Sequence, residues 1–178
     1  GKEVTDFIKN GFPVSAKVGG ITILFVVLAS IPMGILAAVK NGKWQDMAVM
    51  AIATIGVTIP SFVIASVLIY IFSFKLNWLP TYGLDSWKGY ILPVITLGGY
   101  SVSYLARQMR SSLLEVMGQD YIRTARAKGL SETKVIFKHA LRNAMIPVIT
   151  VLGPTIANLL TGSFVVEQIF AIPGLGVH

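Results

Sequence analysis

The 178-residue sequence contains no cysteine, which excludes a disulfide framework, a thiolate metal site and a cysteine nucleophile. Charge is also scarce, since only 13% of the residues are Asp, Glu, Lys or Arg, whereas 54% are hydrophobic. A soluble domain of this length needs far more polar surface, so the mean hydropathy of +0.71 favours a membrane protein. The eight acidic residues are outnumbered by 15 Lys and Arg, which gives a net charge of +7.

Signatures of catalysis and of nucleotide binding are missing as well. The two histidines, His139 and His178, are far apart in sequence, and a solvated or helix-capping His139 is favoured over a catalytic or metal-binding one. Neither Gly1–Lys2 nor Gly42–Lys43 has the upstream glycine or the following Ser/Thr of a phosphate-binding loop. The sequence starts without methionine and stops directly after an apolar run, so we expect an internal piece of a longer protein.

Four long stretches carry no charged residue: 18–39, 47–74, 89–106 and 143–166. Crossing a hydrocarbon core of about 30 Å takes roughly 20 helical residues, so each stretch is long enough to span, the third only just. The alternative is four buried helices of a large soluble core, but such helices are usually shorter and carry polar faces. We expect one all-α transmembrane domain over 1–178.

The lysines and arginines predict the orientation of these spans. Four spans place ten basic residues on one side: Lys40, Lys43, Arg107, Arg110, Arg123, Arg126, Lys128, Lys134, Lys138 and Arg142. The other side receives five: Lys2, Lys9, Lys17, Lys75 and Lys88. Because cytoplasmic loops are richer in Lys and Arg, the turn after the first span and the 107–142 loop are expected in the cytoplasm.

Small and polar residues inside the spans have a packing interpretation and a functional one. Ser30, Gly34 and Ala38 recur every four residues, a spacing that lets another helix approach closely. The polar residues of the second and fourth spans either line a transport route or hydrogen-bond to neighbouring helices: Thr54, Thr58, Ser61, Ser66, Thr155, Asn158, Thr161 and Ser163.

The 107–142 loop holds most of the excess charge, with eight basic residues and three acids. Apolar residues recur there at intervals of three and four, which predicts helices. Asp120 is placed to cap or favour a helix start, Gly129 to end that helix, and Ser131 to cap the next one. The interpretation is a helix, a glycine corner and a second helix.

Three uses of this basic segment stay open from the pattern alone. It is a solvated loop without a partner, a surface helix on anionic lipid, or a docking element for a soluble protein. Its basic residues lack the aromatic interleaving that stacks on bases, so a membrane-tethered nucleic-acid binder ranks lowest and no nucleic-acid partner is expected.

Residues 120–144, DYIRTARAKGLSETKVIFKHALRNA, resemble the cytoplasmic signature loop (the EAA loop) of permease subunits in binding-protein-dependent ABC importers. The segments SIPMGILAAVKNGKWQD, TIPSFVIASVLIYIFSFKLNWLPTYG and VVEQIFAIPGLG are also similar to those permeases. The resemblance is closest to the oligopeptide, dipeptide and nickel branch. Where many importers have Glu-Ala-Ala, this chain has Arg123, Thr124 and Ala125, and residues 139–142 replace the family's Ile-x-Leu-Pro; both departures fit the peptide branch.

The resemblance implies a polytopic, all-α transmembrane bundle of the ABC importer permease type in a bacterial or archaeal cell (inner) membrane. Its partners would be a second permease, usually a paralogue, two cytoplasmic ATPases, an extracytoplasmic substrate-binding protein and membrane lipid. ATP and Mg²⁺ would be bound by the ATPases, with no cofactor in this chain. A coupling helix that docks on the ATPase is implied at Asp120, Tyr121, Arg123, Thr124, Ala125, Arg126, Ala127, Lys128, Gly129, Leu130 and Ser131.

The function implied is a permease subunit for short peptides, not an enzyme. One alternative is import of nickel or another small solute by the same architecture. A rival of another class is an autonomous channel or secondary transporter, but no predicted span contains the acid or base that ion-coupled carriers usually need.

Glu167 is the one acid at the outer end of the last span. Its functional interpretation is a contact at an external gate or with the substrate-binding protein. Its other interpretation is a carboxylate in interfacial water just past the apolar run, because charges at span ends cost little.

Overall fold

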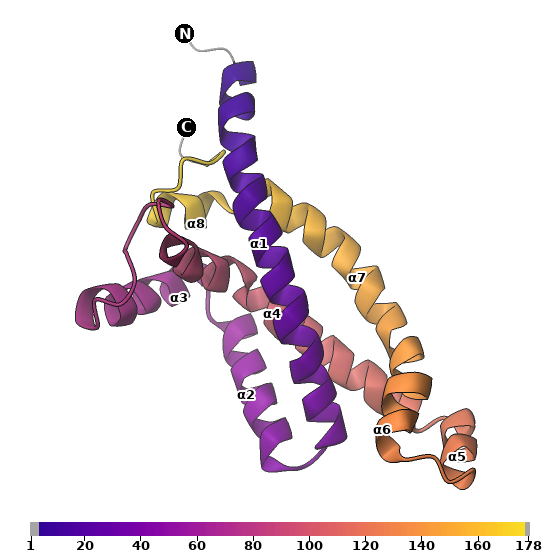
Figure 1. Ribbon diagram of the computed structural model, residues 1–178. Helices are drawn as coiled ribbons and strands as arrows, with labels where there is room; N and C mark the ends of the chain where they lie inside the picture. Colours follow the sequence, from indigo (N-terminus) through magenta and orange to yellow (C-terminus); the bar gives the residue numbers. More distant parts are fainter. Residues whose placement is uncertain (1–3, 177–178) are drawn as a thin grey trace.

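The computed structural model describes residues 4–176, and every regular element in that range is helical (Figure 1). The elements are α1 (Val4–Val39), α2 (Trp44–Thr58), α3 (Ser61–Leu68), the π-helical η1 (Ile69–Lys75), α4 (Lys88–Met117), α5 (Asp120–Ala127), α6 (Glu132–Lys134), the π-helical η2 (Val135–Ala140), α7 (Leu141–Thr161) and α8 (Phe164–Ile169). The predicted all-α class is confirmed.

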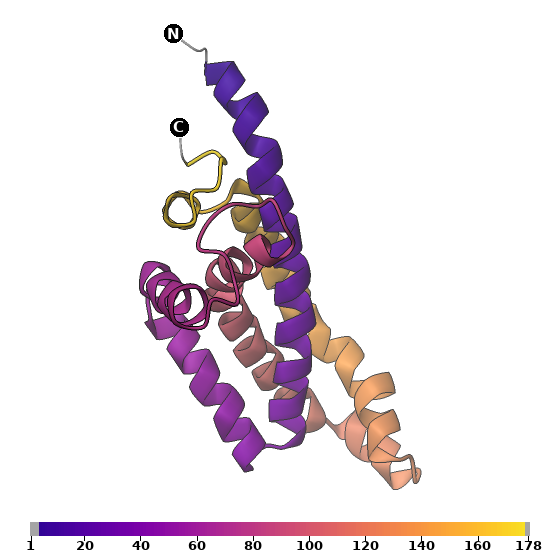
Figure 2. The same cartoon turned by 60° about the vertical axis from the view of Figure 1, so that its left-hand side comes forward.

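The long helices α1, α4 and α7 form the body of the bundle, with α2 beside them (Figures 1 and 2). The start of α1 and the short helix α8 lie at one end, whereas the α1–α2 turn and α5 lie at the other. The start of α1, which carries Lys9 and Lys17, and α5, which carries Arg123 and Arg126, therefore lie towards opposite ends of the described residues. Which end faces the cytoplasm stays a prediction.

Three helical stretches of the described chain are long and apolar enough to cross a membrane: Ile8–Val39, Lys88–Met117 and Glu132–Ile169. A fourth crossing exists if Trp44–Thr58 and Ser61–Lys75 form one bent span. Many large apolar side chains remain exposed, among them Leu24, Leu28 and Phe62, at 53–65% of their surface. Such surface suits contact with lipid or with other membrane subunits.

The expected second span, 47–74, is not one straight helix. It breaks between Thr58 and Ser61, and α2 and the following helix meet at 110°. Pro60 explains the break, because proline disfavours helical geometry in the residue before it, and Ile59 is extended with φ −86° and ψ 126°. The chain then continues through α3 and η1, which run across the direction of α2 (Figure 1).

The boundaries of the third and fourth spans also differ from those predicted. Helix α4 extends to Met117, so Arg107 and Arg110 belong to a helix and not to the loop predicted over 107–142. Helix α7 ends at Thr161, because Gly162 takes φ +76°, a conformation that glycine adopts at little cost. Residues 164–166 therefore lie in α8 and outside the last long helix.

The main core lies between α1, α4 and α7, towards the end that carries α5. Its fully buried members include Val26, Leu105, Met109 and Val148. Ser30, Gly34 and Ala38 are all buried, so the predicted small-residue face of α1 is a packing face. A Cβ on Gly34 would lie 2.5 Å from Cβ of Met109, which shows how closely α1 approaches α4.

Candidate functional site

The predicted coupling segment is a compact helix, corner and helix. Gln119 is the N-cap of α5 and makes no side-chain capping bond, so Asp120 is not the cap. It lies in the first turn, where its charge favours the helix start, the other role predicted for it. Gly129 follows α5 with φ +76°, as predicted for a glycine corner. Ser131 occupies the N-cap position of α6 as expected, but its side chain makes no capping bond.

Helix α5 is fastened to the bundle by its inner face. Ile122 is fully buried and Ala125 is 6% exposed, and both belong to the main core together with Val135 of η2. Their spacing of three residues places them on one side of the helix. The short helix is therefore part of the packed body, and Ala125, one of the predicted docking residues, faces inward.

Polar contacts hold the same segment from the sides. The guanidinium of Arg126 binds the carboxylate of Glu132 across the glycine corner, with Nε to Oε1 at 2.7 Å and Nη2 to Oε2 at 3.3 Å. Asn143 of α7 donates from Nδ2 to the hydroxyl of Tyr121 at 2.7 Å. The contact between Arg123 and Asp120, at 3.5 Å between fully solvated groups, contributes little. The segment is thus tied to both α6 and α7.

The outer face of the segment is open. Most of the predicted docking residues are exposed there: Asp120, Tyr121, Arg123, Thr124, Ala127, Lys128, Gly129 and Ser131. Arg126 and Leu130 are half-buried. Nothing lies within 4 Å of a Cβ built on Gly129, so the corner itself is bare on this chain. A rigid base and an exposed, basic outer edge are what a docking element needs.

An ion pair joins the α1–α2 turn to α4 near the same end. Arg110 donates to both carboxylate oxygens of Asp46, which also accepts a hydrogen bond from the backbone N–H of Gly42 at 2.9 Å. The Asp46 side chain is only 5% exposed. The sequence analysis did not predict this pair, because nothing in the local pattern connects positions 46 and 110.

Glu167 lies in a different environment from either of those predicted. It is 3% exposed, and Ser15 of α1 donates to its Oε1 at 2.5 Å while the N–H of Gly176 donates to its Oε2 at 2.7 Å. A carboxylate in interfacial water is therefore wrong for this structure. The carboxylate is also covered by its own chain, so it offers no exposed group to a binding protein, and a gating role stays unassigned. Its two donors lie 152 and 9 residues away in the sequence, so no local pattern indicated that Glu167 is buried and hydrogen-bonded.

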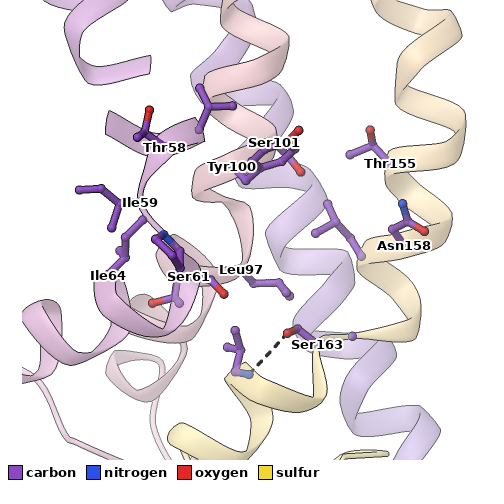
Figure 3. A pocket seen from close by; sticks show the side chains of 17 residues that line it. Thr58, Ile59, Ser61, Ile64, Leu97, Tyr100, Ser101, Thr155, Asn158 and Ser163 are labelled. Atoms are coloured by element: carbon purple, nitrogen blue, oxygen red, sulfur yellow. Dashed lines mark hydrogen bonds between the residues drawn. The ribbon is translucent and has the colours of Figure 1, made fainter. Parts of the chain in front are cut away.

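A cavity of about 580 Å³ lies between the α2–α3 break, α4 and the carboxyl end of α7 (Figure 3). Thr58 and Ser61 come from the break between α2 and α3, Tyr100 and Ser101 from α4, and Thr155 from α7. The remaining lining residues are Gly56, Val57, Ile59, Pro60, Ile64, Thr96, Leu97, Asn158, Leu159, Gly162, Ser163 and Val166. The lining mixes hydroxyl and amide groups with aliphatic side chains and carries no charge, and the cavity volume lies within the roughly 300–1,000 Å³ of small-ligand sites.

The hydroxyl-bearing residues of the predicted spans fall into two groups, those that line the cavity and those that do not. Thr54, Ser66 and Thr161 donate to carbonyls of their own helices, and Thr54 also accepts a hydrogen bond from Arg107 of the neighbouring α4. Thr58 and Thr155 do the same and also line the cavity. Thr96 was missed by sequence reasoning, although the cavity's position was signalled by Pro60, the residue that breaks the span.

Comparison with known proteins identifies relatives over nearly the whole sequence. The profile of the family described as "Binding-protein-dependent transport system inner membrane component" matches residues 30–178. A dipeptide transport system permease of Bacillus subtilis is 47% identical over 175 residues, which are 98% of this chain and 57% of that protein. A glutathione transport system permease of Escherichia coli K12 is 46% identical over the same shares of the two chains. The present chain thus spans little more than half the length of these relatives.

One solved structure has the same fold. It is described as a crystal structure of an amino acid ABC transporter with histidines, and its TM-score to this chain is 0.71. The match covers 96% of this chain and 74% of the other at 17% sequence identity. At that identity the likeness concerns the arrangement of helices alone.

Proposed function

The chain belongs to the family of inner membrane components of binding-protein-dependent transport systems, and we propose that it is a permease subunit that imports short peptides. As a member of that family with several membrane-spanning helices, it is a multi-pass protein of the bacterial cell membrane. The proposed cargo follows from relatives whose names state a dipeptide and glutathione, itself a tripeptide.

The observation that carries the proposal is the anchored element formed by α5, Gly129 and α6. We infer that residues Asp120–Ser131 dock on a separate ATPase subunit. The buried Ile122 and the two side contacts, Arg126 to Glu132 and Tyr121 to Asn143, support this role. A displacement imposed on the exposed edge passes into α4 and α7, whereas a solvated loop would absorb it.

The remaining parts of the proposed transporter are a second permease subunit, two ATPases that bind ATP and Mg²⁺, and an extracytoplasmic binding protein. This chain then supplies part of the pathway and no catalytic step. A nucleotide shifts a conformational equilibrium only as far as it binds one state better than the other. ATP would close the ATPase pair, and the docked α5 would move α4 and α7 with it.

Cross-linking tests the docking directly, and these 178 residues contain no cysteine that would interfere. In the full-length chain assembled with its cognate ATPases, Lys128→Cys is expected to cross-link to an ATPase that carries a cysteine in its surface cleft. Lys75→Cys, an exposed lysine at the end of η1, is the matched control and is expected to give no product. Equal yields from both positions would refute the docking.

A transport assay tests coupling and cargo together. Gly129→Val forces a β-branched residue into φ +76°, so uptake per ATP hydrolysed is expected to fall severalfold, whereas Gly129→Asn should be tolerated because asparagine accepts that conformation. Proteoliposomes with the complete transporter should take up labelled dialanine. Uptake of Ni²⁺ with no peptide uptake would replace the peptide by the metal as cargo.

A further inference from the structure

One side of α4 is polar and largely exposed for about three helical turns. Its residues recur at intervals of three and four, so they lie on one face, which we call the α4 polar face: Tyr100, Tyr104, Arg107, Gln108 and Ser111. Tyr100 and Tyr104 are 57% and 41% exposed, and their rings stack with centroids 6.3 Å apart. The exposed side of α1 is, by contrast, apolar and includes Leu24 and Leu28.

Part of the α4 polar face lies too deep in the span for lipid headgroups to solvate it. Lys88 begins α4, and Tyr100 lies about 18 Å further along a helix that crosses about 30 Å of hydrocarbon. Tyrosines that anchor a helix at the lipid–water boundary lie near its ends, so Tyr100 is not one of them. Polar groups at such depth face protein or a water-filled cavity, because burying them in lipid tails costs free energy.

A pocket of about 470 Å³ lies between this face and α2. Its lining residues are Thr54, Val57, Thr58, Tyr104, Arg107, Gln108 and Ser111. Val57 and Thr58 also line the cavity of about 580 Å³, in which Thr58 and Tyr100 are labelled in Figure 3. The two spaces therefore share a wall just before the break between α2 and α3, and together they follow the α4 polar face.

Arg107 is the charged residue of this pocket lining, and it has no carboxylate partner in the part of the chain that the structure describes. Its Nη2 donates to the hydroxyl of Thr54, which lines the same pocket. A guanidinium can donate several hydrogen bonds, so most of its donors stay available to a ligand. Arg110 differs, because it donates to both carboxylate oxygens of Asp46. Glu115, the next acid along α4, lies about 12 Å beyond Arg107 on the helix axis.

We propose that Arg107 binds the C-terminal carboxylate of the transported peptide, in a water-filled part of the pathway that the α4 polar face lines. The inference rests on the proposed peptide import. A guanidinium and a carboxylate match in charge and in planar, two-point geometry. The described pocket lining contains no acidic side chain that would repel the carboxylate.

The same pocket offers neutral groups to the rest of the peptide. The amide of Gln108 and the hydroxyls of Ser111 and Thr58 can form hydrogen bonds with its backbone. Because every unmodified peptide has a terminal carboxylate, a site of this kind selects for that group and not for particular side chains. Such selectivity suits the import of short peptides of varied sequence.

Thiol labelling tests whether the α4 polar face meets water. Single cysteines are placed at Tyr100→Cys and Tyr104→Cys in the complete permease–ATPase complex in nanodiscs, on a cysteine-free background. They are expected to react with a water-soluble sulfonate thiol reagent at least about tenfold faster than Leu24→Cys and Leu28→Cys. These controls have the same spacing and lie on the exposed apolar side of α1, at 60% and 65% exposure. Equal rates at all four positions, both without nucleotide and with ATP and vanadate, would overturn the water-filled face.

Direct binding tests the carboxylate contact. The same complex, without the binding protein and its own peptide specificity, is titrated with dialanine and with dialanine amide, observed by saturation-transfer NMR. Losing the carboxylate is expected to weaken binding about tenfold, the equivalent of about 1.4 kcal/mol. Arg107→Gln should remove this difference by weakening dialanine binding alone, which a merely structural role would not do. Lys138→Gln is the matched control, since it removes one positive charge from an exposed residue outside this pocket lining. Equal affinity of the unmodified complex for the two ligands would overturn the proposal.

The outcomes distinguish this proposal from the one on which it rests. Normal uptake of dialanine by the complete transporter, together with unchanged dialanine binding in Arg107→Gln, would overturn the carboxylate site and leave peptide import intact. Failure of the unmodified transporter to take up any peptide would overturn the proposed function itself. Dialanine binding and uptake that both fall in Arg107→Gln but not in Lys138→Gln would support both.

Discussion

The carboxylate of Asp46 accepts two hydrogen bonds from the Arg110 guanidinium, with Nε at 2.6 Å from Oδ1 and Nη2 at 2.7 Å from Oδ2. Planar, two-point contacts of this kind are stronger and more directional than single ones. The same guanidinium also donates to Oδ1 of Asn41 at 2.9 Å, so the turn between α1 and α2 is fixed to α4 at three points.

Removing either partner of this pair is expected to destabilise the protein. Asp46→Ala leaves Arg110 partly buried without its counter-ion, and the free energy of unfolding should fall by about 2–3 kcal/mol, less than for fully buried pairs because Arg110 keeps 26% exposure. A double-mutant cycle with Arg110→Ala, measured by denaturant titration in detergent, should give a coupling of at least about 1 kcal/mol. Arg107→Ala is the control, since that exposed arginine contacts only Thr54 in the described structure. Additive single changes would contradict the finding.

The buried carboxylate of Glu167 is expected to hold together the end of the bundle that carries α8. Glu167→Gln keeps the shape but points an amide donor at one of the N–H and O–H donors of Gly176 and Ser15, so unfolding should become easier by about 1–3 kcal/mol. Limited proteolysis within residues 170–176 should accelerate in parallel. A rate equal to that of the unmodified protein would mean that the carboxylate does not fix this segment.

Gly174→Ala tests the same cluster without removing a charge. A Cβ there would lie 2.6 Å from both the Glu167 carboxylate and the Ser15 hydroxyl, so the acceptor and its donor must shift. The expected loss in stability is about 1–3 kcal/mol. Gly20→Ala is the matched control: nothing lies within 4 Å of its Cβ, and an alanine within α1 should stabilise the helix by about 0.5–1 kcal/mol.

The contact of α1 with α4 predicts the effect of a larger residue at Gly34. In Gly34→Ala the new Cβ would lie 2.5 Å from the Met109 Cβ and 2.7 Å from the Ala106 carbonyl oxygen, and the helices must separate. The unfolding temperature should fall, by an amount equivalent to about 1–3 kcal/mol. Gly99→Ala, on a part of α4 with open space around the new Cβ, should have no such effect. Equal behaviour of the two variants would show that the helices are not closely packed.

The contact between Arg126 and Glu132 is expected to be important for coupling ATP hydrolysis to transport and to contribute little to stability. Both side chains are substantially exposed, at 36% and 60%, so Glu132→Gln should leave the free energy of unfolding nearly unchanged. Uptake per ATP hydrolysed should fall, because the glycine corner becomes free to bend. The exchanged pair Arg126→Glu with Glu132→Arg should recover much of the loss, and failure of both to alter coupling would remove the contact from the mechanism.

Local sequence signals predicted the elements that depend on local chemistry. The charge-free runs located the long helices, and Gly129 was correctly predicted to end α5, because only the residue itself decides whether φ +76° is accessible. The face of Ser30, Gly34 and Ala38 was likewise visible at four-residue spacing. The helical class and the family needed no knowledge of contacts.

Features that depend on contacts between distant residues were missed or misplaced. The sequence predicted one span over 47–74, and a proline within a helix can either kink it or break it, so the 110° bend at Pro60 was not predicted. Neither interpretation of Glu167 included its hydrogen bonds from residues 15 and 176. Thr96 is one threonine among several in the spans, and its lack of a partner becomes visible only when its neighbours are in place.

The bond from Ser15 to Glu167 has a consequence for synthesis. These residues are 152 positions apart, so α1 emerges from the ribosome long before its contact with Glu167 can form. At about 5–20 residues per second, roughly 8–30 seconds separate the two. Throughout that interval the Ser15 hydroxyl needs a temporary acceptor, from water, lipid headgroups or the insertion machinery. The Ser15–Glu167 bond can therefore form only after the ribosome has completed translation of this segment. Arrest before residue 167 should leave α1 accessible to labelling at position 15.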